Sequence, residues 1–402
     1  MKKYNENVII LITMDKIDEI LTKGVTNIIP SKNGLEKLLR SKKKLNVYLG
    51  IDPTATKIHL GNAVSLRKLQ AFVELGHNVT FLIGDFTALI GDTSDKESER
   101  PILSYEEIKK NFKTYRKQTS KIVDFSKVKI VKNSTWLKKL SFSDIVKLCQ
   151  NFSLNDFLSR ELIKKRLNQG KKIRLDEVLY PIMQGYDSYF LDTDIQIGGA
   201  DQTFNMQAGR VLQKKLRNKE TFILITGYLE GTDGRKMSKS WNNAIWLEDT
   251  PENIFGKIMS INDNSITDYF ELATNVSLQR LEAEKNALKN GENPMSVKTR
   301  LAFEIVKELY SKKEAKKAQK YFEKTFREKM PEFKQKIKAK KTLAETISQI
   351  VGSMNKAKTL ISQKAVKINT ITITDPKTKI RGGEEIKIGK KTFIKVDPQN
   401  RE

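Results

Sequence analysis

The sequence predicts an α/β protein in which a parallel sheet is covered by helices, followed by an α-helical domain and a small α/β domain. Two short apolar strands, at residues 47–49 and 79–83, are separated by a helical pattern at residues 60–75 that ends at Gly76. A strand, helix and strand in this order form a crossover between parallel strands, whose ligands lie at the carboxyl ends of the strands. The spacing of apolar residues becomes helical after residue 250 and alternates again near the C-terminus, which predicts the two further domains.

Residues 1–46 are predicted to be an N-terminal extension followed by helices, because apolar residues recur there at helical spacing on both sides of Pro30. The apolar run at residues 8–12 lacks a small-residue cleavage site, and it is much shorter than the roughly 20 apolar residues of a membrane-spanning helix. Met14 could be the native start, so residues 1–13 are left out of the fold prediction.

A turn-rich loop joins the first of these strands to the following helix. His59 begins that helix, and Gly61 in its first turn lets another group approach the backbone closely. The free N–H groups of a first helical turn, with the helix dipole behind them, favour an anion such as phosphate. Taken alone, the pattern also fits a tight connection between a strand and a helix.

A second polar loop, at residues 231–240, follows a predicted strand at residues 222–226. This loop contains Lys236 and Lys239 beside small hydroxyl residues. Mobile cations next to hydroxyl groups suit a polyphosphate whose negative charge grows on the leaving group. The loop is therefore a second candidate for phosphate binding.

Residues 104–180 are helical and rich in lysine, with an apolar strand at residues 128–131, and we interpret them as an insertion between two half-sheets. The helix at residues 175–190 carries three polar residues on one face, at offsets of four and three: Tyr180, Gln184 and Asp187. Such a face either lines a site or is simply solvated. With a short strand at residues 195–197, these elements complete a domain predicted over residues 47–250.

The C-terminal quarter of the chain is strongly basic. The net charge is +26, and residues 300–402 hold 27 Lys and Arg against 12 Asp and Glu. Drift in genome composition would spread charge evenly, so this concentration favours a part that binds a polyanion. We predict an α-helical domain over residues 251–333, a basic linker at residues 334–341 and a small α/β module over residues 342–402.

The cysteine and histidine content argues against a disulfide or a metal centre. Cys149 is the only cysteine, so it has no partner within the chain. His59 and His77 are the only histidines, which are too few for a histidine cluster. We therefore expect no structural metal bound by the protein, and a reducing compartment such as the cytoplasm.

The two loops together resemble the paired signatures of class I aminoacyl-tRNA synthetases. His-Leu-Gly-Asn at residues 59–62 resembles the first signature, and Lys-Met-Ser-Lys-Ser at residues 236–240 matches the second letter for letter. Four further motifs resemble, in order and spacing, those of tyrosyl-tRNA synthetases, and they lie at residues 50–54, 90–92, 180–187 and 196–202. The resemblance covers roughly residues 35–400.

The resemblance implies a Rossmann-like catalytic domain that activates tyrosine with ATP and transfers it, through tyrosyl-adenylate, to the 3′ end of tRNA(Tyr). ATP would be a substrate, accompanied by Mg²⁺. In this family the helical insertion forms the dimer interface, so a homodimer without a membrane partner is expected. Residues 353–369 resemble the RNA-binding domain first seen in a small-subunit ribosomal protein. Its candidate RNA contacts are Lys356, Lys358, Lys364 and Lys367, unless this basic surface is merely solvated.

The resemblance also assigns residues to the nucleotide. Those that would hold the phosphates or act in catalysis are Thr54, His59, Asn62, Lys236 and Lys239, with Lys96 and Arg100 as further candidates. Those that would contact ATP are Gly50, Asp52, Gly61, Gly199, Asp201, Met237, Ser238 and Lys239. Asn62 departs from the usual histidine at its position, although an amide can still donate a hydrogen bond.

For the amino acid, Tyr48 and Asp187 match positions that hydrogen-bond the tyrosine phenol. The positions that match those binding the ammonium group are Asp92, Tyr180 and Gln184, with Asn133, Trp136 and Gln202 as further pocket candidates. Packing explains Trp136 equally well. A pocket built to pair with a hydroxyl group rejects phenylalanine, because its own polar groups would be left without partners.

The expected first reaction needs no general base, because the carboxylate of an amino acid is already ionised at neutral pH and can attack the α-phosphate. The protein has to align the reactants and stabilise the charge on the phosphoryl oxygens. Three alternatives remain: a tryptophanyl-tRNA synthetase, an RNA-binding protein with a decayed synthetase core, and a small-molecule adenylyltransferase. Tyr48 with Asp187 argues against the first, the two signatures against the second and the basic C-terminal part against the third.

Overall fold

The computed structural model describes residues 16–41, 43–92, 103–327, 335–369, 371–389 and 392–397. The chain forms two compact units, residues 1–316 and residues 317–402. The predicted residues Lys96 and Arg100, and the excluded residues 1–13, lie outside the described part of the chain.

The first unit is organised around a six-stranded sheet in the order β1-β6-β5-β2-β3-β4. Its strands are β1 (Val25–Ile29), β2 (Asn46–Ile51), β3 (Asn78–Ile83), β4 (Val128–Lys132), β5 (Ile195–Gly199) and β6 (Phe222–Thr226). β1 pairs antiparallel with β6, and all other neighbours in this sheet pair in parallel. The central strands are mostly apolar and buried, as expected when helices cover both faces of a parallel sheet.

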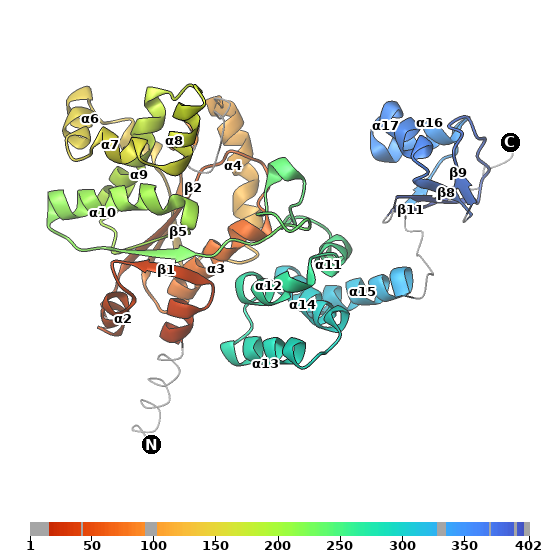
Figure 1. The fold of residues 1–402 in the computed structure, drawn as a ribbon, viewed down its shortest axis with the longest axis horizontal. Helices are drawn as coiled ribbons and strands as arrows, with labels where there is room; N and C mark the ends of the chain where they lie inside the picture. The colour runs from red at the N-terminus through yellow and green to blue at the C-terminus, as the bar shows by residue number, and fades with distance from the viewer. Residues whose placement is uncertain are drawn as a thin grey trace, which may run out of the picture. The chain divides into compact units, whose positions relative to one another are not determined.

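Helices cover both faces of this sheet. α3 (Leu60–Glu74) contacts β2, β3 and β5, while α10 (Thr203–Arg217) contacts β5 and β6. α9 (Leu175–Phe190), the predicted polar helix, packs along α10. Figure 1 shows α9 and α10 on one side of the strands and α2 (Lys32–Arg40) on the other.

Two predictions for this unit were wrong. Residues 25–29 were expected to be helical, but they form β1, because their β-branched side chains fit a strand that extends the sheet beside β6. β4 does not interrupt an insertion: it pairs in parallel with β3 and forms an edge of the sheet. α4 (Tyr105–Thr119) is therefore the crossover helix between β3 and β4.

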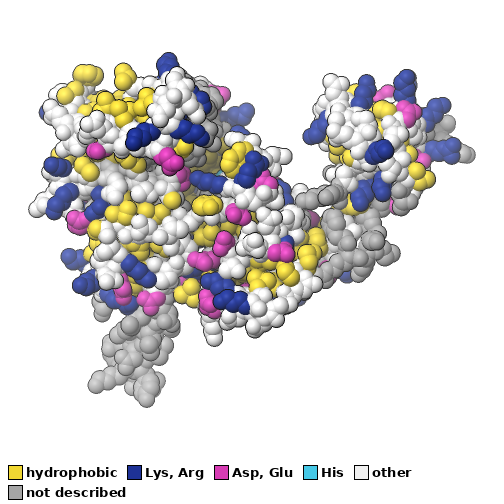
Figure 2. All heavy atoms as spheres, viewed as in Figure 1, with side chains coloured by type: hydrophobic (Ala, Val, Ile, Leu, Met, Phe, Trp, Pro, Cys, Tyr) yellow, Lys and Arg dark blue, Asp and Glu magenta, His cyan; other side chains and the backbone are white. Residues whose placement is uncertain are grey.

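Four short helices separate β4 from α9, and they are α5 (Ser134–Leu137), α6 (Phe142–Cys149), α7 (Leu154–Leu158) and α8 (Glu161–Asn168). The side chain of Ser141 caps α6 by accepting a hydrogen bond from the backbone of Asp144. Offsets of four and three place Phe142, Val146 and Cys149 on one face of α6. Phe142 is 80 % exposed and Val146 43 % exposed, so this face is apolar and open to solvent (Figure 2).

The rest of the first unit is helical, as predicted. α11 (Pro251–Met259), α12 (Ile266–Ala273), α13 (Leu278–Lys289) and α14 (Pro294–Leu309) pack on one another. Proline at the first position suits the start of α11 and α14, because that position needs no N–H donor. α15 (Lys312–Phe322) follows, and the boundary between the two units falls within it. None of the helices in the described ranges is long and apolar enough to cross a membrane.

The second unit is a five-stranded sheet in the order β7-β11-β10-β8-β9, with two helices packed together. Its elements are β7 (Gln335–Ile337), α16 (Leu343–Val351), α17 (Met354–Ser362), β8 (Val366–Ile368), β9 (Ile371–Ile373), β10 (Glu385–Ile388) and β11 (Thr392–Val396). The predicted α/β character of this module is confirmed. The predicted linker at residues 334–341 was wrong in part, because β7 pairs in parallel with β11 and joins the sheet.

Candidate active site

The candidate site lies at the carboxyl ends of the central strands. β2 lies between β5 and β3, so the strand order changes direction there, and ligands of open α/β sheets bind outside the strand ends at such a point. Asp52 follows β2, Gly84 follows β3 and Asp201 follows β5. The topology therefore brings together three segments that are far apart in the sequence, two of which belong to the predicted motifs at residues 50–54 and 196–202.

A chain of hydrogen bonds links these strand ends to α9. The hydroxyl of Tyr180 donates to Asp52 Oδ2 at 2.9 Å, and the hydroxyl of Thr87 donates to Asp52 Oδ1 at 2.8 Å. Asn133 Nδ2 then donates to Thr87 Oγ1 at 3.0 Å and to Asp187 Oδ2 at 3.1 Å. The predicted residues Asp52, Asn133, Tyr180 and Asp187 thus belong to one network, with Asp187 at its buried end.

Gly84 is required for this arrangement. A Cβ atom on residue 84 would lie 1.9 Å from Asp52 Oδ1 and 2.4 Å from Thr87 Oγ1, which is closer than any side chain can approach. The loop after β3 can therefore pass beside Asp52 only with glycine at this position. Gly84 was not predicted as a site residue.

Asp187 is a buried carboxyl group. It is 2 % exposed, and its Oδ1 accepts a hydrogen bond from Trp136 Nε1 at 2.7 Å. Burial raises the pKa of Asp187 to about 8, against the opposing effect of its hydrogen bonds from Asn133 and Trp136. Trp136 therefore positions Asp187 as well as packing against its neighbours, so both interpretations of this residue apply.

Tyr48 lies beside this carboxyl group. Burial raises the pKa of its phenol well above the usual value, and the neighbouring Asp187 adds to the effect. The Tyr48 hydroxyl donates to Gln196 Oε1 at 3.1 Å, and Gln196 Nε2 donates to the carbonyl of Met206 at 2.9 Å. Gln196 is fully buried and was missed as a site residue, although a glutamine within an apolar parallel strand was a usable signal.

The remaining predicted ligands of the amino acid also lie near the strand ends. Gln202 Nε2 donates a short hydrogen bond to Asp92 Oδ2 and a longer one, at 3.4 Å, to Asp201. Asp92 is 9 % exposed, so its carboxylate is nearly buried. Gln184, on the polar face of α9, is half-buried. The structure thus brings Asp92 and Gln202 into contact, as their assignment to one pocket requires.

The first signature forms the start of α3. His59 is the N-cap, and its Nδ1 accepts from the backbone N–H of Asn62 at 3.3 Å. The side-chain oxygen of Asn62 accepts in return from the backbone N–H of His59 at 3.2 Å, which completes a capping box. Burial, helped by the nearby Lys236 ammonium, lowers the pKa of His59 to about 4, so this imidazole is neutral at pH 7.

The two signatures meet in space. The backbone N–H of Leu60 donates to the carbonyl of Ile245 at 2.9 Å, and the N–H of Leu247 donates to the carbonyl of Ile58 at 3.0 Å. The segment that follows the polar loop at residues 231–240, called the lysine loop below, is therefore paired with the segment that begins α3. The nearest side chain of the lysine loop to Gly61 is the buried Met237, whose Cβ lies 3.6 Å from where a Cβ on Gly61 would be.

The two signature lysines are exposed. Lys236 Nζ lies 3.6 Å from Asp201 Oδ1, so a residue of the second signature reaches the end of β5. Lys239 begins a short 3₁₀ helix (Lys239–Trp241) that the side chain of Ser238 caps. Lys236 thus lies beside the carboxylate that follows β5.

Three further residues predicted to contact ATP lie in the same region. Thr54 is half-buried in the loop after β2, and its backbone N–H donates to the carbonyl of Asp52 at 2.8 Å. Gly50 is exposed near the end of β2. Gly199 ends β5 and is half-buried.

The four lysines predicted to bind RNA are all exposed in the second unit. Lys356 and Lys358 lie on α17, and Lys364 follows that helix. Lys367 lies on β8 between the buried residues Val366 and Ile368, so its side chain is on the outer face of the sheet.

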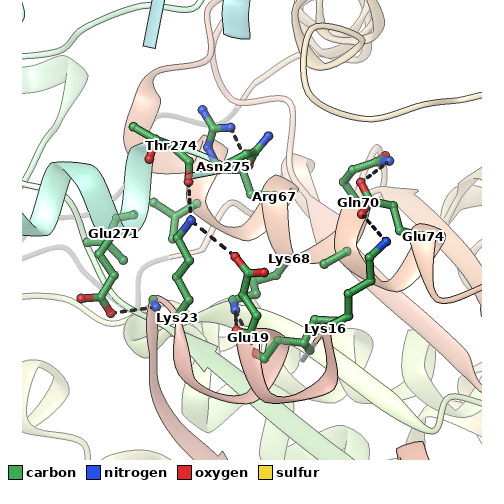
Figure 3. A pocket seen from close by; sticks show the side chains of 15 residues that line it. Lys16, Glu19, Lys23, Arg67, Lys68, Gln70, Glu74, Glu271, Thr274 and Asn275 are labelled. Atoms are coloured by element: carbon green, nitrogen blue, oxygen red, sulfur yellow. Dashed lines mark hydrogen bonds and ion pairs between the residues drawn. The ribbon is translucent and has the colours of Figure 1, made fainter. Parts of the chain in front are cut away.

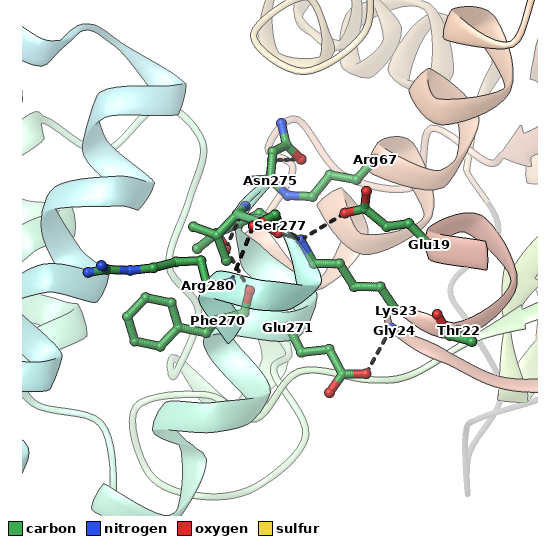
Figure 4. A network of polar contacts seen from close by, with 12 residues as sticks. Glu19, Thr22, Lys23, Gly24, Arg67, Phe270, Glu271, Asn275, Ser277 and Arg280 are labelled. Carbon is green, nitrogen blue, oxygen red and sulfur yellow. Dashed lines mark hydrogen bonds and ion pairs between the residues drawn. The ribbon is translucent and has the colours of Figure 1, made fainter. Parts of the chain in front are cut away.

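α3 also takes part in a group of polar contacts with the helix at residues 16–22 and the end of α12, which the sequence did not predict. A cavity of about 180 Å³ lies between the helix at residues 16–22, α3 and the end of α12 (Figure 3). Arg67 Nη2 donates to the carbonyl of Ala273 at 2.7 Å, and Lys23 Nζ donates to the carbonyl of Thr274 at 2.9 Å (Figure 4). Cations are favourable at a helix C-terminus, so these two side chains attach α12 to the sheet domain.

Lys68 takes part in the same group of polar contacts. Its ammonium is buried and donates to the carbonyls of Ile20 at 2.9 Å and Glu19 at 3.2 Å. Burial lowers the pKa of Lys68 to about 7, with the neighbouring Lys23 ammonium acting in the same direction. A buried lysine in the middle of an otherwise amphipathic helix gives no signal that separates it from a solvated one.

The donor groups in the described ranges do not form a metal centre. No group of three or more His, Cys, Asp or Glu side chains there could hold a metal ion. Cys149 is half-buried at the end of α6, and burial raises the pKa of its thiol.

Residues 40–327 match the family model described as tRNA synthetases class I (W and Y), where W and Y stand for tryptophan and tyrosine. Residues 340–386 match the S4 domain. These two matches cover the catalytic and C-terminal parts that the sequence motifs indicated.

Curated relatives match nearly the whole chain. A tyrosine–tRNA ligase from Carboxydothermus hydrogenoformans is 43 % identical over 397 residues, covering 94 % of this chain and 97 % of the relative. One from Dehalococcoides mccartyi is 40 % identical over 391 residues, covering 95 % and 98 %.

Solved structures share the fold. A tyrosyl-tRNA synthetase complexed with L-tyrosine from Archaeoglobus fulgidus has a TM-score of 0.60 at 23 % identity, covering 76 % of this chain and 99 % of that one. A C-terminally truncated mitochondrial tyrosyl-tRNA synthetase from Aspergillus nidulans has a TM-score of 0.65 at 19 % identity, covering 78 % and 94 %.

Proposed function

The chain belongs to the class I tRNA synthetases of the tryptophan and tyrosine group, and from its site we propose how it works as a tyrosine–tRNA ligase. The observation that carries the proposal is the position of Asp187. This buried carboxyl group lies beside Tyr48, at the inner end of the hydrogen-bond network that begins at the strand ends. A ligand with a phenol at one end and a carboxylate at the other would span that network.

The amino acid is proposed to bind with its phenol between Tyr48 and Asp187. Asp187 has two fixed donors, Trp136 and Asn133, so its orientation is set before the substrate arrives. A phenol can both donate to and accept from these two groups, whereas a phenyl ring can do neither and an indole can only donate, so both would leave part of the hydrogen-bonding capacity of the pocket unmet at a cost of about 1–3 kcal/mol. Asp92, Tyr180 and Gln184 face the ammonium end in this arrangement.

ATP is proposed to bind across the strand ends, against the start of α3. The positive end of the α3 dipole and the ammonium groups of Lys236 and Lys239 surround the phosphates. His59 is neutral, so it acts through hydrogen bonding, and the positive charge comes from the lysines. Asp201 accepts from the ribose hydroxyls, which requires Lys236 to move from its present ion pair to the phosphates. Magnesium is treated as part of the ATP substrate.

The chemistry then follows from alignment. The carboxylate of tyrosine attacks the α-phosphorus, the bond to the bridging oxygen breaks, and pyrophosphate leaves with its charge held by the lysines. No proton has to be removed from the nucleophile. In the second step the terminal ribose hydroxyl of tRNA(Tyr) attacks the activated carbonyl, the bond from that carbon to the phosphate oxygen breaks, and AMP leaves while the hydroxyl proton passes to its phosphate or to water.

The second unit is proposed to bind tRNA. Its exposed lysines on α17 and β8 can contact phosphates of a folded RNA, which suits recognition by shape. Both tRNA and ATP are substrates found in the cytoplasm, so we propose that the protein works there.

A homodimer is proposed on the face formed by α6 and the end of α9. A groove beside α6 is lined by apolar side chains, including Trp136, Leu148 and Phe190. Phe190 is 48 % exposed, and the exposed Phe142 and Val146 on α6 extend the apolar surface. A second copy of the chain would bury both patches about a twofold axis.

Val146→Glu should shift the protein to a monomer in sedimentation analysis, whereas Leu154→Glu on the neighbouring helix α7 is the control.

ATP–pyrophosphate exchange measured with tyrosine, with tryptophan and without an amino acid tests the proposal. Exchange that depends on tyrosine alone is expected. Exchange that depends on tryptophan would assign the other specificity of the group, exchange without an amino acid would indicate an adenylyltransferase, and no exchange at all would indicate a decayed core.

A further inference from the structure

One buried side chain just after the lysine loop has no role in the site as described so far. Asn243 is 2 % exposed and lies just after the second signature. Its Oδ1 accepts from the backbone N–H of Ser238 at 2.8 Å. Its Nδ2 donates to Asp233 Oδ1 at 2.7 Å and to the carbonyl of Lys236 at 3.2 Å. The amide therefore bonds to both arms of the loop.

These bonds flank the two lysines that face the phosphates. The Asn243 amide donates to the backbone carbonyl of Lys236. It also accepts from the backbone N–H of Ser238, the residue before Lys239, so it fixes the backbone next to both lysines. Asn243 is also continuous with the segment that pairs with the start of α3, through Ile245. A single amide thus connects the position of both cations to the position of His59.

The surrounding loop leaves room for the Asn243 amide. A Cβ atom on Gly231 would lie 2.3 Å from Asn243 Cγ, so the glycine leaves the space that the side chain fills. Asp233, the acceptor of Asn243 Nδ2, is also bound by Arg235 Nε at 2.9 Å, and Arg235 lies over the ring of Trp241 at 4.5 Å. Hydrogen bonds, with that from Asn243 first, lower the pKa of Asp233 to about 2.

We propose that Asn243 is a positioning residue for tyrosine activation: its amide, seated over Gly231, sets where Lys236 and Lys239 present their charges to the leaving pyrophosphate. The inference rests on the proposed role of the two lysines. An amide is needed because one end must accept from an N–H while the other donates to a carboxylate and a carbonyl. A carboxylate at residue 243 could make the first bond, but it would repel Asp233.

Asn243→Asp tests the inference because it keeps the shape and removes the donors. Displacing catalytic groups by about 1 Å can cost roughly 100-fold in rate, so kcat for tyrosine-dependent exchange should fall by roughly 10- to 100-fold. The KM for tyrosine should change less than about twofold, because the amino acid pocket is formed by other elements. Asn253→Asp, the same change at an exposed position of α11, is the matched control and should keep wild-type kcat.

Two further variants distinguish positioning from general loss of structure. Adding Asp233→Asn to Asn243→Asp reverses the direction of the hydrogen bond between the two residues, and it should restore kcat several-fold. Gly231→Ala leaves the chemistry of Asn243 intact but displaces its amide, and it should reproduce the fall in kcat with an unchanged KM for tyrosine. If Asn243→Asp fails to fold, Gly231→Ala still tests the inference.

Lys239→Ala is measured in parallel. Wild-type kcat for both Asn243→Asp and Gly231→Ala, with a slow Lys239→Ala, would overturn the inference and leave the proposed function standing. An unchanged Lys239→Ala would instead refute the proposed role of the lysines. A fall in kcat accompanied by an equal rise in the KM for tyrosine would show general damage, and would also overturn the inference.

Discussion

At the scale of single residues, the site depends on a carboxyl group whose partners are fixed before substrate binds. Asp187→Ala removes the acceptor of Trp136 Nε1, one of the two acceptors of Asn133 Nδ2 and the proposed partner of the phenol. We expect tyrosine-dependent pyrophosphate exchange to fall below detection. Lys239→Ala should lower kcat by roughly 10²–10³ with little change in the KM for tyrosine. Wild-type exchange by Asp187→Ala would discard the pocket assignment.

The same residue predicts a dependence of stability on pH. The pKa of Asp187 is about 8 in the folded protein and 3.8 in its ordinary state, so the folded state binds the extra proton between these values. The free energy of unfolding should therefore fall as pH rises from about 4 to 8. Asp187→Asn cannot titrate and should flatten this part of the profile in urea titrations. A profile identical to that of the wild type would show that Asp187 does not titrate in this range.

Single residues also mark the limit of prediction from the sequence. Motif order predicted that Asp52, Tyr180 and Asp187 lie together, and the structure places them in one hydrogen-bond network. Asn62 was predicted to face phosphate. In the structure its side chain caps α3 by accepting from the backbone N–H of His59, a contact that the signature motif does not predict. Gln196 and Asn243 were missed because their partners, a buried phenol in one case and backbone groups in the other, depend on the tertiary fold.

At the scale of elements, α3 joins the site to the helical domain. The buried ammonium of Lys68 has a pKa of about 7, below its ordinary value of 10.5, so the unfolded state binds more protons between these values. The free energy of unfolding should rise with pH from about 7 to 10 on account of this residue. Lys68→Met keeps the packing and should flatten that rise in thermal melts recorded across the range. Gln70→Met, on the same helix, is the control and should keep the wild-type profile.

Elements were predicted well where local pattern and tertiary role agreed. α9 and the crossover of β2, α3 and β3 follow directly from apolar periodicity. β1 and β7 were missed because each is a short strand that pairs with a distant segment, β6 and β11 respectively, while its own sequence looks helical or merely basic. The register of β4 could not be predicted either, because only its pairing with β3 distinguishes an edge strand from part of an insertion.

At the scale of the whole molecule, the two compact units separate two tasks. Replacing Lys356, Lys358, Lys364 and Lys367 together by alanine should weaken tRNA binding and leave tyrosine-dependent pyrophosphate exchange unchanged, because these side chains lie in the second unit. Each lost phosphate contact should reduce the slope of log affinity against log salt by about 0.7–0.9. Filter binding at several salt concentrations measures this slope. An unaltered slope would show that these lysines are only solvated.

The sole thiol of the chain lies on the apolar face of α6, with Phe142 and Val146. The protein therefore carries its own chemical reporter of self-association. Alkylation of Cys149 by a maleimide should slow as protein concentration rises and the faces of two copies cover each other, and no residue has to be engineered to observe it.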